Sequence, residues 1–436
     1  MRVLVVAVLL SCVVFGRSFA QGAEGDAAGR TGYAQWKNGP PADPNWFPIA
    51  VYLQAPKNAS RYKDVGINLY IGLWQGPTEE QLAELRKHDM KLICEQNEVG
   101  LKHLADPMIV GWMQMDEPDN AQTMGRYWKS TDQIKQAWPN APAEGLPEWH
   151  TRTMEDWGQW GPCESPKTII ERYTQMKAND PTRPVYLGLG VGVCCDEWPG
   201  RRRANHPQDY PLYMRGADIA GFDVYPMATT FEKARDRIWL VPYGVQRLVK
   251  WAGGRTIIWN SLECSAISRA DRGPTPKQVR AEVWMSLIHG STGIIYFAHV
   301  MESSRLSETG LLDDKEMAAE VKKTNEQIQR LAPVLNSPTV PGSVTVAAEP
   351  SRVSKGLAET LGGGPVPTMA KRHGGATYVF AVNMENWPVS GTFQVKGLSG
   401  GAGVEVIDEG RKLDAKDGAF TDQFEPYAVH LYRIGR

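Results

Sequence analysis

The stretch VGWMQMDEPDN (110–120) decides the fold, because an apolar run leads into two acids and stops at Pro118. Its first residues have the near-continuous apolar character of a strand that is buried on both faces of a parallel sheet. Leaving an unpartnered carboxylate at the end of such a strand costs several kcal/mol. The pair Asp116 and Glu117 therefore indicates a strand whose end carries a functional site.

Seven further runs share this apolar, β-rich character. They are PIAVYLQ (48–54), GINLYIGLW (66–74), MKLICEQ (90–96), PVYLGLG (184–190), IAGFDVYP (219–226), TIIWNSLE (256–263) and GIIYFAH (293–299). Amphipathic segments with helical spacing lie between many of them, at 78–89, 168–179, 231–253, 275–290 and 313–335. Strands that alternate with helices predict βαβ units. Eight units predict an α/β fold of the (β/α)8 TIM-barrel type over residues 45–337, with a doubly wound sheet as the alternative.

The pattern changes after Pro338. The segments SVTVAAEP, ATYVFAVN, GTFQVKG, GVEVIDEG and PYAVHLYRI alternate apolar and polar residues and are separated by glycine and proline turns. This alternation is typical of strands with one buried face. We predict a small C-terminal β-sandwich over residues 338–436.

The N-terminus predicts export. One arginine precedes an apolar run, and Ser18-Phe19-Ala20 has the small-x-small pattern of a cleavage site. We expect a signal peptide at 1–20 with cleavage after Ala20, a linker at 21–44, and a secreted or periplasmic protein. No later run reaches the ~18 apolar residues of a membrane span.

Composition limits the partners. A formal net charge of -1 gives no electrostatic basis for binding nucleic acid or an anionic membrane. The chain has 15 tryptophans against 10 phenylalanines, and tryptophan stacks well on flat apolar faces such as those of sugar rings, although many fill cores. The sequence does not predict an oligomeric state.

The cysteines do not form a metal motif. Five remain after removal of the signal peptide, so at least one is unpaired. Cys163 is positioned to form a loop disulfide with Cys194 or Cys195, whereas Cys94 and Cys264 lie in apolar runs and are expected to be buried thiols. Without paired C-x-x-C motifs, the sequence predicts no metal and no cofactor.

Two strand-end carboxylates stand nearly opposite each other in the predicted barrel. Glu117 ends strand four and Glu263 ends strand seven. Side chains at the carboxyl ends of barrel strands face the active site. Two carboxyl groups across a barrel mouth suit the hydrolysis of a glycosidic bond, with one as acid/base and the other as nucleophile.

This arrangement resembles the clan A glycoside hydrolases, which are retaining enzymes built on a (β/α)8 barrel. The segments GWMQMDEP and TIIWNSLECS carry the resemblance, together with AEVWMSLIHGSTGIIYFAH (281–299), which is similar to β-galactosidase-like members, and PYAVHLYRI. The resemblance implies Glu117 as the acid/base and Glu263 as the nucleophile. Many members have asparagine before the acid/base, where this chain has Asp116, which we expect to bind a sugar hydroxyl.

Further residues are candidates for substrate binding, each with a structural alternative. Tyr225 is expected to hydrogen-bond the nucleophile or to be a core tyrosine, and His299 to line the site or to be a satisfied buried histidine. Asn97 and Glu98 are expected to bind sugar hydroxyls or to belong to an ordinary loop. Trp74 and one of Trp157 and Trp160 are expected to be stacking platforms, in loops that border the cleft.

The sequence therefore predicts a secreted retaining glycoside hydrolase that cleaves β-glycosidic bonds in a poly- or oligosaccharide. One alternative is a carbohydrate-binding protein on a degenerate barrel, in which the two glutamates point apart. Another is a barrel enzyme of different chemistry, which would need clustered His and Asp ligands. The basic cluster GRRRANH (200–206) is either a solvated turn or a contact for an anionic sugar.

Overall fold

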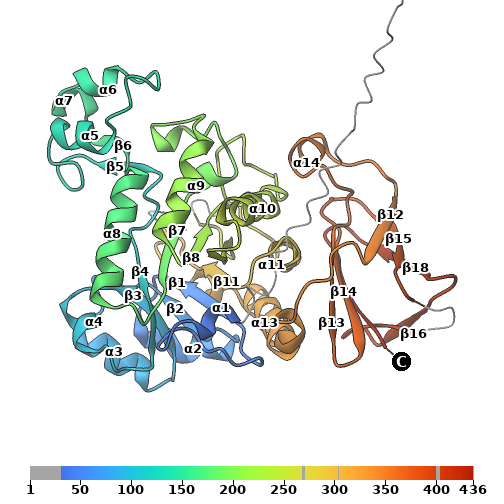
Figure 1. Ribbon diagram of the computed structural model, residues 1–436. Helices are drawn as coiled ribbons and strands as arrows, with labels where there is room; N and C mark the ends of the chain where they lie inside the picture. The colour runs from blue at the N-terminus through green and yellow to red at the C-terminus, as the bar shows by residue number, and fades with distance from the viewer. Residues whose placement is uncertain (1–30, 268–270, 303, 399–402, 436) are drawn as a thin grey trace, which may run out of the picture.

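The computed structural model describes residues 31–267, 271–302, 304–398 and 403–435 (Figure 1). A barrel and a β-sandwich lie side by side, with two long helices between them. The expected signal peptide at 1–20 and the start of the linker lie outside the described residues. Secretion therefore stays a prediction from the sequence.

The barrel is a closed parallel sheet of eight strands, the seventh of which is split in two. Strands β8 and β9 pair, β10 pairs with β11, and β11 pairs with β1, while a bridge from Asp223 to Ser261 closes the remaining gap beside Trp259. This closure confirms the predicted (β/α)8 fold and excludes the doubly wound sheet. The strands are β1 (Ile49–Tyr52), β2 (Leu69–Ile71), β3 (Lys91–Glu95), β4 (Ile109–Met113), β7 (Val185–Leu189), β8 (Ile219–Phe222), β9 (Ile257–Ile258), β10 (Asn260–Glu263) and β11 (Ile294–Phe297).

Alternate residues of each strand face inward or toward the helices. The inward set includes Ile71, Ile93, Tyr186 and Trp259, which form one buried cluster. Tyr33, from α1 (Thr31–Ala34), joins this cluster and accepts a hydrogen bond from the Trp259 indole at 2.7 Å. The segment 31–44 thus contributes to the barrel core and is more than the linker that the sequence predicted.

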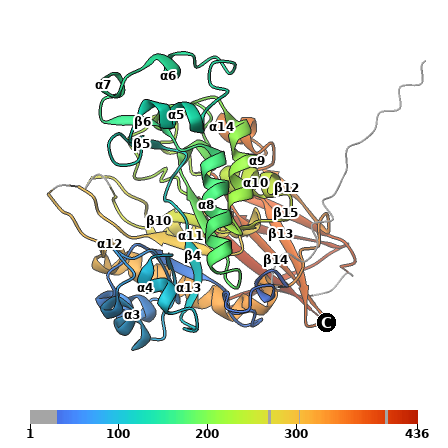
Figure 2. The same ribbon diagram turned by 60° about the vertical axis from the view of Figure 1, so that its left-hand side comes forward.

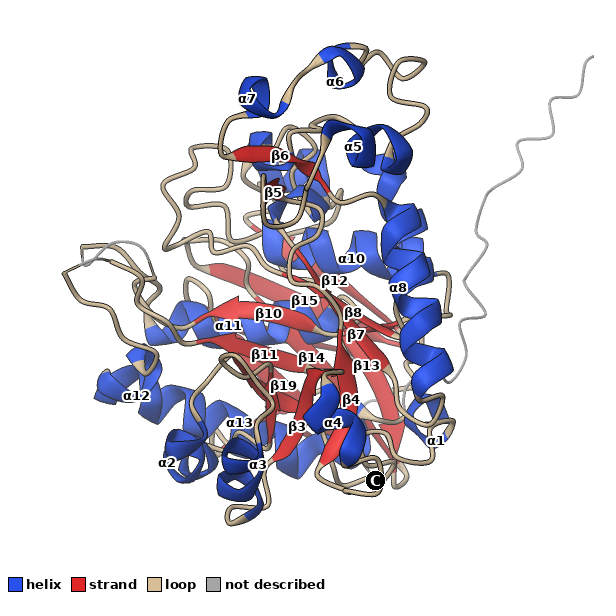
Figure 3. Ribbon diagram, turned by 90° about the vertical axis from the view of Figure 1, so that its left-hand side faces the viewer, coloured by secondary structure: helices blue, strands red, loops and turns tan. Residues whose placement is uncertain are grey.

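The helices surround the sheet (Figure 3). Several begin directly after a capping side chain, including α3 after Thr78, α8 after Ser165, α11 after Thr275 and α13 after Asp314. The described chain has no helix of the length and apolar character needed to cross a membrane. The helices are α2 (Ala59–Asp64), α3 (Glu79–Arg86), α4 (Glu98–Lys102), α8 (Pro166–Asn179), α9 (Tyr210–Tyr213), α10 (Leu240–Ala252), α11 (Pro276–Ile288), α12 (Gly310–Asp313) and α13 (Lys315–Leu335).

One predicted helix is too long. The segment 231–253 forms a helix only from Leu240 onward, as α10. Pro242 lies in its first turn, where a missing N–H is tolerated, and its ring would clash with the carbonyl four residues earlier in a longer helix. The residues before Leu240 instead form turns that cover the end of β8.

Residues 120–164, here called the arm, project from the end of β4 and form a folded unit (Figures 1 and 2). Its buried side chains form their own cluster, which includes Trp128, Trp138, Trp149 and Trp157. The arm, expected to be a loop, contains β5 (Ala121–Thr123), α5 (Thr131–Ala137), α6 (Glu148–Thr151), α7 (Met154–Trp157) and β6 (Trp160–Cys163).

The basic cluster of 200–206 anchors the arm. The Arg203 guanidinium lies over the Trp138 ring at 4.4 Å and pairs with Glu144 of the arm at 2.5 Å. Arg201 and Arg203 are both buried and both bind Asp209. These two arginines therefore form a buried ion cluster. The sequence had predicted either a solvated turn or a contact for an anionic sugar, and neither prediction applies to them.

The C-terminal sandwich is confirmed and contains more strands than the sequence indicated. One sheet has the order β12-β15-β18 and the other β13-β14-β19-β16-β17. Trp284 of α11 stacks on Phe380 of β14 at 5.4 Å, and the buried Lys371 amine donates to the carbonyls of Leu335 and Ser337 at the end of α13. The elements are β12 (Val344–Glu349), α14 (Lys355–Thr360), β13 (Thr368–His373), β14 (Ala376–Val382), β15 (Val389–Val395), β16 (Gly403–Val406), β17 (Arg411–Asp414), β18 (Ala419–Phe424) and β19 (Val429–Ile434).

A buried arginine ties strand four to strand five of the barrel. Arg183, directly before β7, is fully buried, pairs with Asp180 at 2.8 Å and donates to the carbonyls of Leu104, Asp106 and Ile109. Its guanidinium also lies 5.6 Å from the Trp112 ring. These contacts fix the lower end of β4, whose upper end carries the acids.

We predict that Arg183→Met destabilises the protein by about 3–5 kcal/mol, because it leaves Asp180 buried without its counter-charge. Urea unfolding measures the change. Lys167→Met is the control, since Lys167 pairs with Glu171 on an exposed helix face, and it should cost less than about 0.5 kcal/mol. Equal losses in the two variants would contradict the role assigned to Arg183.

Candidate active site

The acidic turn after β4 brings two neighbouring carboxyl groups to the barrel mouth. Gln114 points outward and donates to the carbonyls of Ile169 and Gly216, and the Glu117 amide donates to the Gly188 carbonyl at 3.1 Å. Glu117 has a φ of 39°, which is uncommon for a residue with a side chain and is found preferentially at functional sites. This backbone allows Asp116 and Glu117 to approach the same group, Asp223 at the end of β8.

Glu117 and Asp223 form a hydrogen-bonded carboxyl pair. Burial, followed by the charges of Asp223 and Asp116, raises the pKa of Glu117 well above its usual range. Burial also raises the pKa of Asp223, to about 7, although hydrogen bonds with Glu117 and Tyr225 oppose the rise. Near neutral pH the pair therefore holds a proton, and Glu117 is the donor toward Asp223.

Asp116 is the carboxyl group that meets solvent. Its side chain is exposed in the mouth, whereas Glu117 and Asp223 are half-buried. The surrounding protein and the nearby Asp119 raise the pKa of Asp116, and a hydrogen bond from the Tyr52 hydroxyl favours the ionised form. The mouth thus combines a half-buried acid, whose pKa is well above its usual range, with a carboxyl group that is exposed to solvent.

Glycines make room for these acids. A Cβ on Gly190 would lie 2.9 Å from a Glu117 carboxyl oxygen and 2.7 Å from the Asn120 amide nitrogen. A Cβ on Gly221 would lie 3.1 Å from the Tyr186 hydroxyl, which sits below the cluster. Inward-facing positions on β8 and just after β7 are therefore kept free of side chains so that the carboxyl groups fit.

An aromatic wall runs outward from the carboxyl groups. The Phe297 ring stacks on Tyr225 at 5.1 Å and contacts Tyr52 at 6.1 Å and His299 at 4.9 Å. His299 in turn meets Trp74 edge-on at 5.7 Å, and Trp74 is 49% exposed. We call Tyr52, Trp74, Tyr225, Phe297 and His299 the aromatic wall. It contains Trp74, Tyr225 and His299 from the expected binding residues, although His299 is buried and its ring is hydrogen-bonded to Gln54 and to the Tyr52 carbonyl, as the alternative of a satisfied histidine predicts.

Glu263 does not face the mouth. Its side chain is fully buried, and its carboxyl oxygens accept the backbone N–H groups of Met227 and Ala228 at 2.7 and 2.8 Å. Glu282 of α11 lies against it in the same buried space. The expectation that Glu263 faces Glu117 across the mouth is therefore wrong. Tyr225 correspondingly bonds Asp223 and Ser261 in place of Glu263.

Three other expected binding residues lie away from the wall. Asn97 caps α4 by accepting the Gly100 amide, and it donates to the Pro77 carbonyl, so its side chain is structural. Glu98 is an exposed first-turn residue of the same helix. Trp157 is buried in the arm, so it is not a platform, while Trp160 at the start of β6 is 44% exposed.

The sequence reasoning passed over two acids. Asp223 stands at the recognised end of strand six and carries the same strand-end signal as Glu117. Glu95 is the last residue of β3 and lies in register with the inward-facing Met113. The sequence predicted that this strand continues to residue 96, so Glu95 was not recognised as a strand-end acid. Both would have been found by testing every acid near a strand end.

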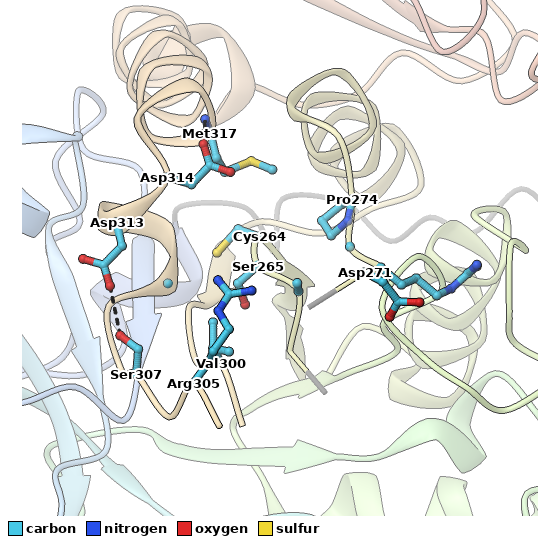
Figure 4. Close-up of a pocket in the computed structure, with 14 residues that line it drawn as sticks. Cys264, Ser265, Asp271, Pro274, Val300, Arg305, Ser307, Asp313, Asp314 and Met317 are labelled. Atoms are coloured by element: carbon cyan, nitrogen blue, oxygen red, sulfur yellow. Dashed lines mark hydrogen bonds between the residues drawn. The ribbon is translucent and has the colours of Figure 1, made fainter. Parts of the chain in front are cut away.

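A separate cavity of about 500 Å³ opens beside the site (Figure 4). It lies between the loops that follow β10 and β11, with Cys264, Ser265, Val300 and Arg305 among its lining residues. None of the mouth carboxyl groups lines it.

The described part of the chain shows neither a disulfide nor a metal cluster. All five cysteines from Cys94 to Cys264 are free, so the expected pairing of Cys163 with Cys194 or Cys195 is not formed. Cys94 and Cys264 are buried, as predicted. Over the same residues, no group of three or more His, Cys, Asp or Glu side chains is arranged to hold a metal ion.

Comparison with known proteins gives a fold and no family. Neither a protein-family model nor a curated protein sequence matches the chain. A GH42 β-galactosidase from G. stearothermophilus, solved as a catalytic mutant, aligns with 90% of this chain and 98% of its own at a TM-score of 0.55 and 9% identity. A β-galactosidase from Bacillus circulans sp. alkalophilus aligns over 89% and 99% at a TM-score of 0.54 and 8% identity.

The chain shares the fold of these barrel glycosidases. The resemblance inferred from the sequence is thereby confirmed at the level of architecture. At 8–9% identity, the similarity extends to the fold alone. Activity has to be argued from the carboxyl groups themselves.

The buried Glu263–Glu282 pair should make stability fall as pH rises. Burial raises the pKa of Glu263 from 4.5 to about 7, and raises that of Glu282 further. The folded protein therefore retains protons that the unfolded chain releases, so stability is lost between about pH 5 and pH 8. We predict that Glu282→Gln stabilises the protein by at least about 1 kcal/mol at pH 8 and flattens this dependence.

Denaturant unfolding at both pH values measures the effect. Glu326→Gln on the exposed face of α13 is the control and should leave the pH dependence unchanged. A Glu282→Gln protein that is less stable at pH 8 than the parent would contradict the assignment.

Proposed function

We propose that the protein is a glycoside hydrolase whose reaction is carried by the carboxyl groups of the acidic turn. The observation that carries the proposal is the cluster of three carboxyl groups at the barrel mouth, in which Glu117 is hydrogen-bonded to Asp223 beside the solvent-exposed Asp116. Hydrolysis of a glycosidic bond needs an acid and a carboxylate of these two kinds. The adjoining aromatic wall supports a sugar as the substrate, because aromatic faces stack on the apolar faces of sugar rings.

Glu117 acts as the general acid. It transfers its proton to the glycosidic oxygen as the bond to the anomeric carbon breaks. Asp223 keeps that proton on Glu117 in the resting site, because its negative charge raises the pKa of Glu117. Once Glu117 has given up its proton, it can accept one from an incoming water.

Asp116 is the carboxylate partner in this proposal, in the place that the sequence assigned to Glu263. It is exposed, accepts the Tyr52 hydrogen bond and adjoins Glu117. Attack by Asp116 on the anomeric carbon gives retention, and activation of a water by Asp116 gives inversion. The anomer released first, followed by NMR, assigns one of these roles. The β-linkage is what the sequence resemblance implies and belongs to the proposal.

A binding protein without turnover is the second candidate. The observation that favours it is the burial of Glu263, which removes the carboxylate expected across the mouth from Glu117. Such a protein would use the aromatic wall and would show no hydrolysis. Equal and unchanged sugar binding by the parent protein and Glu117→Gln, with no product from either, would support it.

The test of the proposal is hydrolysis of β-linked polysaccharides, oligosaccharides and aryl glycosides by the parent protein and three variants. Glu117→Gln should lose about 10²–10⁴-fold on substrates with poor leaving groups, and far less on aryl glycosides whose leaving group needs no proton. Asp116→Asn should lose activity on both classes. Glu263→Gln is the matched control and should retain most activity, and its complete inactivation with a folded protein would overturn the assignment.

A second test uses the pH dependence of kcat/KM. Removing the Tyr52 hydroxyl in Tyr52→Phe takes away a hydrogen bond that favours ionised Asp116, so the pKa of Asp116 rises. We predict that the acidic limb of the profile moves to higher pH. Tyr173→Phe is the control, since the Tyr173 hydroxyl donates to Asp218 at 2.9 Å away from the mouth, and its profile should not move. If the pH profile of Tyr52→Phe does not shift, the role proposed for Asp116 in the reaction is contradicted.

A further inference from the structure

The mouth gathers carboxyl groups from three strand ends. Asp116 and Glu117 follow β4, Asp223 follows β8, and Glu95 ends β3. Glu95 is exposed and lies in register with Met113, whose side chain belongs to the inward cluster. Residues in register on neighbouring parallel strands point to the same side of the sheet. Glu95 therefore faces the same opening as the carboxyl groups of the acidic turn.

Two of the cations near the acidic turn are engaged elsewhere. Arg201, the basic group acting on Asp119, is buried and bound to Asp209. Arg172 of α8 reaches the Met115 sulfur from the helix side and lies 3.7 Å from Glu164. Burial lowers the pKa of His299, so this wall residue is neutral at neutral pH. The charges that act most strongly on Asp116, Glu117 and Asp223 are all carboxylates.

Aromatic side chains also border the mouth. The aromatic wall offers ring faces and the two hydroxyl groups of Tyr52 and Tyr225, and both hydroxyls are already bonded to carboxylates. A sugar ring that stacks on this wall brings its substituents close to Asp116. A substituent with its own negative charge would be desolvated there without a counter-charge, which costs several kcal/mol.

We infer that this site takes glycans that carry no carboxylate or sulfate group, and that it discriminates against uronic acids in favour of the matching neutral or amino sugars. The inference rests on the proposed function and adds the substrate class. Its physical basis is a cleft lined by charges of one sign, which repels ligands of that sign and concentrates ligands of the other. The aromatic wall supplies attraction that does not depend on charge.

Matched substrates test the inference. Aryl glycosides and trisaccharides are compared in sets that differ at one position: glucoside, glucosaminide and glucuronide, and galactoside, galactosaminide and galacturonide, in both anomeric forms. Within the set that is turned over, we expect kcat/KM for the uronide to be at least about tenfold below that of the neutral sugar at low salt. Raising the salt concentration should narrow this difference, because screening weakens the repulsion.

A charge variant links the discrimination to the mouth. Glu95→Gln removes a charge without touching the proposed acid or its partner, and it should raise the ratio of uronide to neutral turnover by about two- to fivefold. Glu326→Gln removes a charge of the same kind on the far helix α13 and should leave the ratio unchanged. An unchanged ratio in Glu95→Gln would overturn the inference.

The outcomes separate the two proposals. If the uronide is the best substrate of its set, the substrate class is wrong while hydrolysis stands. If neutral sugars are turned over and Glu117→Gln has no effect on any leaving group, the site assignment fails and the inference fails with it. If nothing is turned over or bound, the proposed function is overturned, and so is the substrate class that rests on it.

Discussion

Like charges crowded in one barrel mouth cannot all remain ionised, and the active-site region is arranged around this constraint. Asp223 accepts a hydrogen bond from Glu117 and raises the pKa of Glu117. Tyr225 in turn hydrogen-bonds Asp223 and favours its ionised form. The pKa of Asp116 is also raised, but Asp116 is exposed to solvent and the Tyr52 hydroxyl opposes the rise. One strained backbone residue and an inward glycine on the neighbouring strand provide the space in which these groups coexist.

A second pair of acids, Glu263 and Glu282, meets the same constraint in a different way. Glu263 and Glu282 are sealed from solvent, and two backbone amides satisfy the Glu263 carboxyl. In the mouth, excess charge is shared between carboxyl groups that are exposed or half-buried. Behind it, the charge is suppressed by protonation inside a packed core. Two strand-end glutamates of similar sequence context therefore have different environments.

The periphery fixes the shape of the mouth. The arm is held by Arg203 between Trp138, Glu144 and Asp209, and its tryptophans fill its own core. Tryptophan richness in this protein thus serves packing more than sugar binding, with Trp74 and Trp160 as the exposed exceptions. The sandwich packs on the outer helices α11 and α13, through Trp284 and Lys371.

The sequence by itself determined the architecture. Eight apolar runs predicted eight barrel strands, because burial on both faces demands continuous apolar character. The helices predicted at 78–89 and 275–290 begin at their N-caps Thr78 and Thr275, since a cap acts within one turn of chain. The strands β13 (TMAKRH), β17 (RKLD) and β18 (AFTDQF) were not predicted, because charged and polar residues interrupt the apolar alternation that marks the other strands.

The sequence predicted which acids stand at strand ends, but it did not predict which of them meet. A strand-end position placed Asp116 and Glu117 at the mouth, because a strand end lies at one edge of the barrel whatever surrounds it. The direction of the Glu263 carboxyl depends on residues 227, 228 and 282, which become its neighbours only when the barrel closes. The pairing of Glu117 with Asp223 depends on the same closure. Tertiary structure therefore decided which acids meet, because hydrogen-bond partners distant in sequence are set by packing and not by local pattern.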